Sequence, residues 1–344
     1  MNKLSVTEKK QVLLPRNFMK VSILLVILLV VSTFASFAFG SRMINVTDLM
    51  DGLFHPSVES HEANVVRQRI VRTIFCFMCG AALGVSGSLM QSVTRNPIAD
   101  PSILGVNTGA SLFVVCGIAF FNISTANEYI WLAIAGALIT AIFVFGIGSM
   151  GSGGATPLKL VLAGAAMSAI LSSLVVAVMI PRSNVMDKFR FWQVGSVGGG
   201  NWNDISLFIP FLIVGLLIAI FTAPALNALA LGDDVAKGLG VRTGTIRLVA
   251  SFGGVLLCAV ATALAGPIGF IGLLATHLVR LLVGPDVRYV IPLSALTGAM
   301  ILTISDVAGR LLGSPGELEV GIVTAFIGAP ILILITMKAK MRAI

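Results

Sequence analysis

Residues 80–110 read GAALGVSGSLMQSVTRNPIADPSILGVNTGA, and this stretch decides the fold. An apolar run rich in glycine and alanine ends at a polar break, Thr94 to Pro101, and a second apolar run follows it. Pro97 and Pro101 prevent a continuous helix through the break and remove two amide donors. Irregular backbone at membrane depth is tolerated only where protein buries it or water reaches it. The stretch predicts two membrane helices joined by a loop that is a plain turn, the lining of a pathway, or both.

Apolar runs of this kind fill most of the chain. Of its 344 residues, 57% are hydrophobic and only 11% are charged, against about 25% charged in an average soluble domain. A water-exposed surface for a chain of this size needs far more charge. The composition excludes an ordinary soluble enzyme and predicts an integral membrane protein. In such a protein, the net charge of +8 reflects lysines and arginines in the loops beside the membrane and does not indicate binding of nucleic acid.

Ten segments are long and apolar enough to be spans of roughly 20 residues. They lie near residues 20–40, 66–90, 102–121, 129–149, 159–180, 204–224, 246–265, 268–283, 290–312 and 320–338. The first exceeds the core of a secretory signal, which is about 7–15 residues, so we expect it to be retained. The eighth is short and follows Gly266-Pro267, which favours a partial span.

Ten spans place both ends of the chain on one side of the membrane. With that topology, 15 of the 23 lysines and arginines fall on the side of the termini and eight on the other side. Because Lys and Arg accumulate in cytoplasmic loops, both termini are predicted to be cytoplasmic. We expect a single transmembrane domain over residues 1–344, with cytoplasmic segments at residues 1–20 and 338–344.

Few residues suggest chemistry of their own. The chain has no Walker A pattern, so we do not expect it to hydrolyse ATP, and its three histidines are far apart. Cys76 and Cys79 form a C-x-x-C inside an apolar run, but no second cysteine or histidine pair accompanies them, which favours helix packing over metal binding. We expect no catalytic residue, no metal and no cofactor in this chain.

An ordered set of motifs runs through nearly the whole chain. Its members are Arg69 and Arg72, Gly80 to Gly87, Gln91, Arg95 to Pro101, Leu104 to Ala110, Trp192, Gly195-Ser196, Trp202, Gly266 to Leu273, His277, Arg280, Pro292, Ser305-Asp306, Arg310 and Gly321 to Pro330. This set resembles the FecCD-type permeases, the membrane subunits of ABC importers for iron–siderophores, haem and vitamin B12. One position departs from the family pattern, because Val71 stands where the family usually has proline.

The resemblance implies an all-α fold of the type II ABC importer permeases, with ten transmembrane helices in two inverted halves. It implies a bacterial cytoplasmic membrane and a second permease subunit, identical or paralogous, with the pore between the two. It also implies two ATP-binding subunits that hold ATP and Mg²⁺ on the inside and a substrate-binding protein on the outside. An iron–siderophore complex is the expected cargo, with haem or a cobalamin as the alternative.

Three groups of site residues follow from the resemblance. The inner gate is expected at Asn96, Pro97, Ile98, Asp100 and Pro101, with Thr156 and Pro157 as a neighbouring constriction. The segment 225–247 is expected to form two short helices broken at Gly232 and Gly240 and to seat in the ATPase. Its coupling residues are Gly232, Asp233, Asp234, Ala236, Leu239 and Gly240.

The third group is a cluster of cations on the predicted outer side. The resemblance implies that Arg69, Arg72 and Arg310 pair with glutamates of the binding protein. The outer loops of the chain itself offer few acids to neutralise these arginines. Arginine suits this role because its planar fork can bond a carboxylate with two parallel hydrogen bonds. Anchoring to phospholipid headgroups is the alternative.

Two questions stay open on the sequence alone. Asp306 and Arg310, four residues apart in an apolar span, form either an intrahelical ion pair or a functional site. An ion-coupled secondary transporter is the alternative from a different functional class, and it predicts buried carboxylates in mid-span. An intramembrane enzyme would need paired catalytic residues. Asp306 is the one carboxylate that fits an ion-coupled transporter, since the other acids lie almost entirely in loops.

Overall fold

The computed structural model describes residues 17–41, 44–55, 60–123, 125–151 and 156–341. These residues form thirteen α-helices and one short 3₁₀ helix, and no strand occurs among them. Most of the predicted cytoplasmic segment 1–20, Arg42 and the last three residues lie outside the described part of the chain. The prediction of an all-α membrane fold is confirmed.

Ten of the helices correspond to the ten predicted apolar segments. They are α1 (Phe18–Ala38), α3 (His61–Thr94), α4 (Val106–Phe121), α5 (Ala126–Ser149), α6 (Pro157–Met179), α8 (Trp202–Ala230), α10 (Thr243–Ala265), α11 (Ile271–Val283), α12 (Val287–Leu312) and α13 (Val320–Met341). Seven of them are long and apolar enough to cross a membrane, whereas α4, α11 and the apolar part of α13 are shorter. A count of ten spans therefore stays a prediction.

Four short helices complete the described chain: α2 (Val46–Phe54), the 3₁₀ helix η1 (Pro101–Leu104), α7 (Ser183–Val194) and α9 (Asp233–Gly238). The expectation of two short helices between residues 225 and 247 is wrong. Residues 225–230 continue α8 beyond Pro224, and only α9 is separate. The backbone first leaves the right-handed region at Gly232, with φ 113°, and does so again at Gly240, with φ 81°. These two glycines bound α9 because positive φ costs glycine little.

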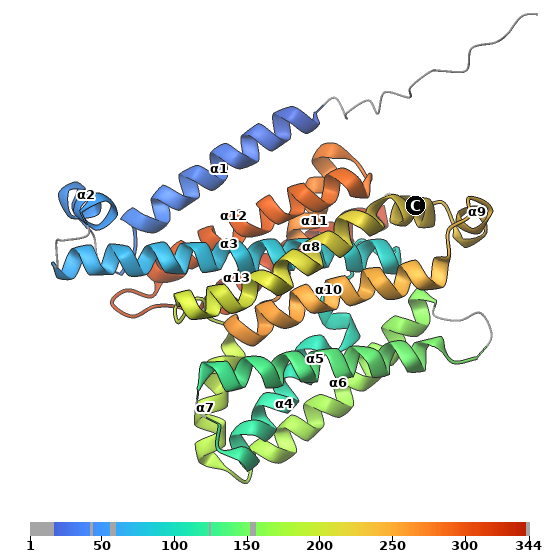
Figure 1. Ribbon diagram of the computed structural model, residues 1–344, viewed down its shortest axis with the longest axis horizontal. Helices are drawn as coiled ribbons and strands as arrows, with labels where there is room; N and C mark the ends of the chain where they lie inside the picture. Colours follow the sequence, from blue (N-terminus) through green and yellow to red (C-terminus); the bar gives the residue numbers. More distant parts are fainter. Residues whose placement is uncertain (1–16, 42–43, 56–59, 124, 152–155, 342–344) are drawn as a thin grey trace, which may run out of the picture.

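Helix α3 lies at the centre of the bundle (Figure 1). Its glycines let the neighbouring helices approach it closely. A Cβ atom on Gly84 would overlap the carbonyl oxygen of Ser294 in α12, and one on Gly80 would overlap that of Gly298. Gly87 meets Gly272 of α11 in the same way. Small residues on one helical face let membrane helices pack backbone to backbone, which explains the glycine-rich stretch from Gly80 to Gly87.

The other helices pack around this centre. Helix α10 packs against α3, where the Ser86 hydroxyl donates a hydrogen bond to the Gly254 carbonyl. Helices α4, α5 and α6 form a second group that joins the centre through the contact of α5 with α10 (Figure 1). Within this group, Gly109 and Gly136 again allow a close backbone contact. Few residues of α1 and α6 are buried.

The bundle has two ends that carry different short helices. Helices α2 and α7 lie at one end and α9 at the other, as Figure 1 shows, and we call these the α2 end and the α9 end. Helix α1 begins at the α9 end, where the rings of Phe18 and Tyr289 lie 4.9 Å apart between centroids. The described C-terminus also lies there. Both ends of the described chain thus share one side of the bundle.

Substituting Gly84→Ala should separate α3 from α12. The added methyl group meets a backbone carbonyl, which cannot move away as a flexible side chain could. We expect a loss of about 1–3 kcal/mol of stability, the usual cost of overpacking, measured as thermal unfolding in detergent. Gly146→Ala in α5 is the control, because nothing lies within 4 Å of its added methyl group. An equal effect of the two substitutions would contradict this packing.

Candidate functional site

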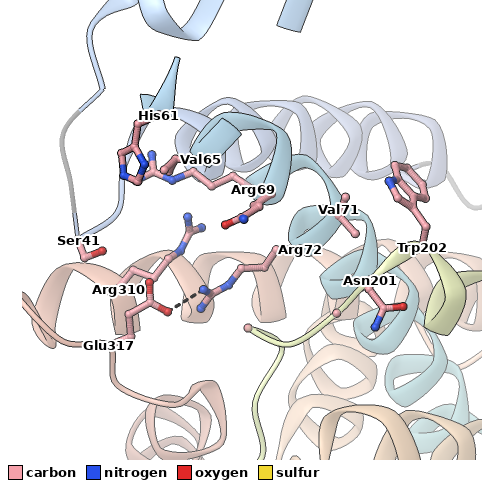
Figure 2. Close-up of a pocket in the computed structure, with 13 residues that line it drawn as sticks. Ser41, His61, Val65, Arg69, Val71, Arg72, Asn201, Trp202, Arg310 and Glu317 are labelled. Atoms are coloured by element: carbon pink, nitrogen blue, oxygen red, sulfur yellow. Dashed lines mark hydrogen bonds and ion pairs between the residues drawn. The ribbon is translucent and has the colours of Figure 1, made fainter. Parts of the chain in front are cut away.

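A pocket at the α2 end gathers the three predicted docking arginines (Figure 2). It has a volume of about 680 Å³. Its lining comes from α3, α12, the start of α8, the segment after α1 and the two loops that precede α8 and α13. The lining residues are Ser41, His61, Val65, Gln68, Arg69, Val71, Arg72, Gly198, Gly200, Asn201, Trp202, Arg310 and Glu317. The sequence analysis therefore placed Arg69, Arg72 and Arg310 correctly in one cluster.

Arg72 is held by two carboxylates. Its Nε and Nη2 atoms donate hydrogen bonds to Asp306, with Nη2 to Oδ1 at 2.6 Å. Its Nη1 atom donates to Oε2 of Glu317 at 2.7 Å. Asp306 is almost fully buried, whereas 39% of the Glu317 side chain is exposed. One edge of the Arg72 guanidinium is thus bound to a buried carboxylate, and the other edge is bound to a carboxylate that is partly exposed to water.

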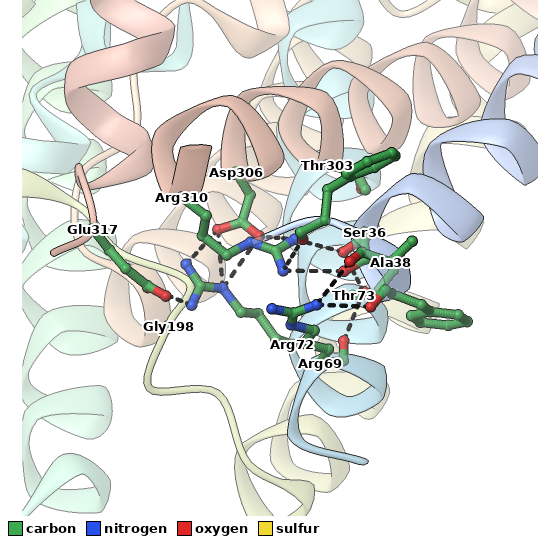
Figure 3. A network of polar contacts seen from close by, with 12 residues as sticks. Ser36, Ala38, Arg69, Arg72, Thr73, Gly198, Thr303, Asp306, Arg310 and Glu317 are labelled. Carbon is green, nitrogen blue, oxygen red and sulfur yellow. Dashed lines mark hydrogen bonds and ion pairs between the residues drawn. The ribbon is translucent and has the colours of Figure 1, made fainter. Parts of the chain in front are cut away.

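Arg310 is the second arginine that pairs with Asp306 (Figure 3). Its Nη2 atom lies 3.0 Å from Oδ2 of Asp306, and it also donates to the hydroxyl of Ser36 at 2.7 Å. Its Nη1 atom donates to the carbonyl oxygens of Ser36 and Phe39 at the end of α1. The residue is only 1% exposed. The intrahelical ion pair of Asp306 and Arg310 therefore exists, but Asp306 serves a second arginine as well.

Arg69 also binds the end of α1. Its Nη1 atom donates to the carbonyl oxygens of Phe37 and Ala38, the first at 2.8 Å. The last carbonyls of a helix have no intrahelical partner and carry the negative end of the helix dipole. Arg69 and Arg310 together supply the donors and the positive charge that this helix end needs.

The expectation that these arginines lack acidic partners within the chain is wrong. Asp306 and Glu317 neutralise Arg72, and Asp306 also neutralises Arg310. Arg310 cannot present its guanidinium to another protein in this conformation because it is buried. Sequence reasoning missed Glu317, since nothing in the chain signals a contact between residues 245 positions apart. Docking itself stays a prediction.

The proline-bounded loop lies at the α9 end. Arg95 ends α3 in the left-handed region, with φ 50° and ψ 33°. The Asn96 side chain accepts a hydrogen bond from the amide of Ile98, and 41% of Ile98 is exposed. Pro97 is also exposed. These three residues form a compact turn whose outer face is open.

The second half of this loop is less exposed, because Ala99 and Pro101 are buried and Asp100 is half-buried. Asp100 accepts a hydrogen bond from the amide of Ser102 and so caps η1, which begins at Pro101. Burial raises the pKa of Asp100 above its usual value, although the hydrogen bonds from Ser102 oppose the shift. Helix η1 packs against α6, which Thr156 caps by accepting a hydrogen bond from the amide of Lys159. Pro157 occupies the first position of α6. The two predicted gate segments therefore lie on neighbouring elements.

Helix α9 presents a different surface from the one expected. Ala236, predicted as a contact residue, is completely buried within this chain, because it lies on the face of α9 turned toward the bundle. Leu239 is 63% exposed, and Val235, four residues earlier, is 51% exposed. Residues four apart share one face of a helix, and that spacing could have identified Val235 from the sequence. Asp234 is fully exposed.

Asp233 joins α9 to two other helices. It forms ion pairs with Arg95, at the end of α3, and with Arg247 of α10, whose Nη2 atom lies 2.8 Å from Oδ1. Partial burial alone would raise the pKa of Asp233, but the hydrogen bonds and charges of Arg247 and Arg95 outweigh it and hold the pKa below its usual value. Asp233 is therefore charged at neutral pH.

The part of the chain that the structure describes offers no metal centre. No three histidine, cysteine, aspartate or glutamate side chains come together among these residues. Cys76 and Cys79 are completely buried in α3 and form no disulfide. The charged side chains of the described residues gather instead at the two ends of the bundle, around Asp306 and Asp233.

Comparisons with known proteins agree with the motifs found in the sequence. A family model described as the FecCD transport family matches residues 28–338. The chain is 40% identical over 316 residues to the ferric enterobactin transport system permease protein FepD of Escherichia coli K12, across 91% of this chain and 94% of that protein. It is also 40% identical over 301 residues to the Fe(3+)-citrate import system permease protein YfmD of Bacillus subtilis 168, across 88% of this chain and 89% of that protein.

A solved structure has the same architecture. It is an inward-facing conformation of a metal-chelate type ABC transporter, and it matches with a TM-score of 0.81 and 28% sequence identity. The match covers 93% of this chain and 99% of that chain. The resemblance that the ordered motifs predicted is confirmed.

Substituting Asp306→Asn should destabilise the α2 end strongly. The change leaves the buried Arg310 without its counter-charge, whereas Arg72 keeps Glu317. Breaking a buried ion pair in this way costs about 3–5 kcal/mol. The measurement is thermal unfolding of the purified protein in detergent. Asp187→Asn is the control, because its ion pair with Arg190, at 3.5 Å, is exposed and such pairs contribute about 0–1 kcal/mol. Similar melting temperatures for both variants would show that Asp306 has no such role.

Proposed function

Because this chain belongs to the FecCD transport family, we propose that it is the membrane-spanning subunit of an ABC importer that carries an iron–siderophore complex into the cell. The observation that carries this proposal is 40% identity, over most of the chain, to permease proteins named for ferric enterobactin and ferric citrate. The fold of a metal-chelate type ABC transporter supports it independently. The chain provides the passage and is not itself an enzyme.

The energy for transport comes from partner subunits. The sequence has no Walker A pattern, so ATP and Mg²⁺ belong to two ATP-binding subunits. We place these subunits at the α9 end and a substrate-binding protein at the α2 end, in a bacterial cytoplasmic membrane. The excess of lysine and arginine predicted for the side of the termini supports this orientation. A second permease chain, identical or paralogous, completes the passage.

Ion-coupled secondary transport is disfavoured by the surroundings of Asp306. A coupling carboxylate must bind and release its ion during each cycle. Asp306 is instead held by Arg72 and Arg310 at 2.6 and 3.0 Å and is almost fully buried. Both oxygens of this carboxylate are already bound by the two arginines, so neither oxygen is open to a coupling ion. Haem or a cobalamin remains the alternative cargo within the same transporter class.

Helix α9 is the proposed contact with the ATP-binding subunits. Its exposed Val235 and Leu239 form an apolar face at an end of the bundle, beside the exposed Asp234. Buried Ala236 attaches the helix to the bundle, and Gly232 and Gly240 allow the turns that set it apart. A short helix fixed on one face and apolar on the other is suited to seat in a groove of a partner.

The pocket at the α2 end is the proposed contact with the binding protein. Arg72 is its central residue, because its Nη1 atom points to the exposed Glu317, whose place a partner carboxylate could take. Arg69 and Arg310 contribute positive charge and hold α1 in position. The gate is proposed at the exposed turn of Asn96, Pro97 and Ile98, which lies at the opposite end.

Uptake by the complete complex in lipid vesicles tests the function. We expect a radioactive ferric siderophore to accumulate only when the ATP-binding subunits, ATP inside the vesicle and the binding protein are all present. Excess haem and cobalamin should not compete if the cargo is a ferric siderophore. Accumulation driven by a sodium or proton gradient without ATP would contradict the ABC importer.

Substituting Glu317→Gln should strengthen association with the binding protein. The change frees Nη1 of Arg72 for a partner carboxylate, and an exposed ion pair is worth about 0.2–1 kcal/mol, or roughly 1.4- to 5-fold in Kd. The measurement is the Kd of the complex for its binding protein at low and high salt, where the gain should shrink at high salt. Glu319→Gln removes the same charge two residues away as the control. Weaker association of Glu317→Gln would mean that Glu317 itself supports docking.

A further inference from the structure

The α9 end contains an ion-pair cluster that the proposed function does not use. Asp233 is its centre, and it belongs to α9, the proposed contact with the ATP-binding subunits. Arg95, from the end of α3, and Arg247, from α10, both pair with it. One carboxylate therefore ties together three elements that are far apart in the sequence.

Arg95 occupies the junction between α3 and the gate turn. It is the C-cap of α3 and is followed directly by Asn96. Its left-handed backbone, with φ 50°, is uncommon for a residue other than glycine or asparagine. The side chain that extends from this junction pairs with α9, so a displacement of α9 acts on the residue at which the gate turn begins.

The two arginines differ in their freedom to move. The Arg247 side chain is only 5% exposed and belongs to a long buried helix, so it anchors Asp233 to the bundle. The Arg95 side chain is 32% exposed and that of Asp233 is 35% exposed. Exposed ion pairs contribute little to stability. The Arg95–Asp233 pair is thus a link that can be lost without loss of the fold.

We propose that Arg95 is a positioning residue for transport: its ion pair with Asp233 transmits displacement of α9 to the gate turn at Asn96, Pro97 and Ile98 within the same chain. The proposal rests on the proposed function, because it takes α9 as the contact with the ATP-binding subunits. It assigns Arg95 no contact with the cargo. The role of the pair is to join ATP hydrolysis in the ATP-binding subunits to opening of the gate turn in this chain.

Arg95→Asn tests the link with little disturbance of the backbone. Asparagine tolerates the left-handed region better than other residues, so the turn can keep its shape while the guanidinium is lost. In the complete complex in vesicles, we expect the amount of cargo transported per ATP hydrolysed to fall about tenfold. Basal hydrolysis and copurification of the ATP-binding subunits should stay within twofold of wild type. Arg95→Lys, which keeps the charge, should recover at least half of the transport.

Asp233→Asn and a matched control sharpen the result. Asp233→Asn should lose at least as much transport per ATP, because it removes the pair with Arg95 and also the pair with Arg247. The double variant should be no worse than Asp233→Asn alone, because Arg95 has already lost its partner in that variant. Arg288→Asn is the control: it also removes a partly exposed arginine from an ion pair at the α9 end, that with Asp286, which does not involve α9.

The possible outcomes separate the two proposals. Wild-type transport per ATP in Arg95→Asn, or an equal loss in Arg288→Asn, overturns the role of Arg95 and leaves the importer intact. Additive losses in the double variant also overturn it. If the wild-type chain neither retains ATP-hydrolysing subunits nor transports, the proposed function fails, and the role of Arg95 fails with it.

Discussion

The backbone contact between α3 and α12 is the constraint on which the rest of the structure depends. Gly80 and Gly84 face Ser294 and Gly298 with no side chain between the backbones. This approach places Arg72, about two turns before Gly80 in α3, within hydrogen-bonding distance of Asp306, about two turns beyond Gly298 in α12. A wider spacing would leave the carboxylate unable to serve both Arg72 and Arg310.

Each end of the bundle uses one aspartate shared by two arginines, but the two clusters differ in burial. Asp306 is 2% exposed, so the arginines stand in for the water that its carboxylate has lost, and removing Asp306 would leave Arg310 buried without its counter-charge. The side chain of Asp233 is 35% exposed, so water can replace a lost arginine there. The first cluster is therefore suited to hold a fold together, and the second to break and re-form.

The sequence predicted the helices better than the contacts of their charged residues. All ten apolar segments became helices, because hydrophobicity over some twenty residues is a property of the chain itself. The partners of Arg72 were not predictable, since Asp306 and Glu317 lie 234 and 245 residues away. The cluster of three arginines was predicted, yet not that two of them bind the end of α1. Ala236 was wrongly predicted to contact the ATP-binding subunits. Helix α9 has only six residues, too few for their pattern to show which face packs against the bundle.

The length of α3 has a consequence for how the protein enters a bilayer. No charged residue lies between Arg72 and Arg95, and at 1.5 Å per residue this part of the helix measures about 35 Å. The hydrocarbon layer is about 30 Å thick, and a tilt of about 20° shortens the helix to a height of roughly 33 Å. Arg72 and Arg95 can therefore lie at opposite headgroup regions at the same time. The part of α3 between Arg72 and Arg95 can thus insert as an uncharged rod, and these two arginines mark where the bilayer begins and ends.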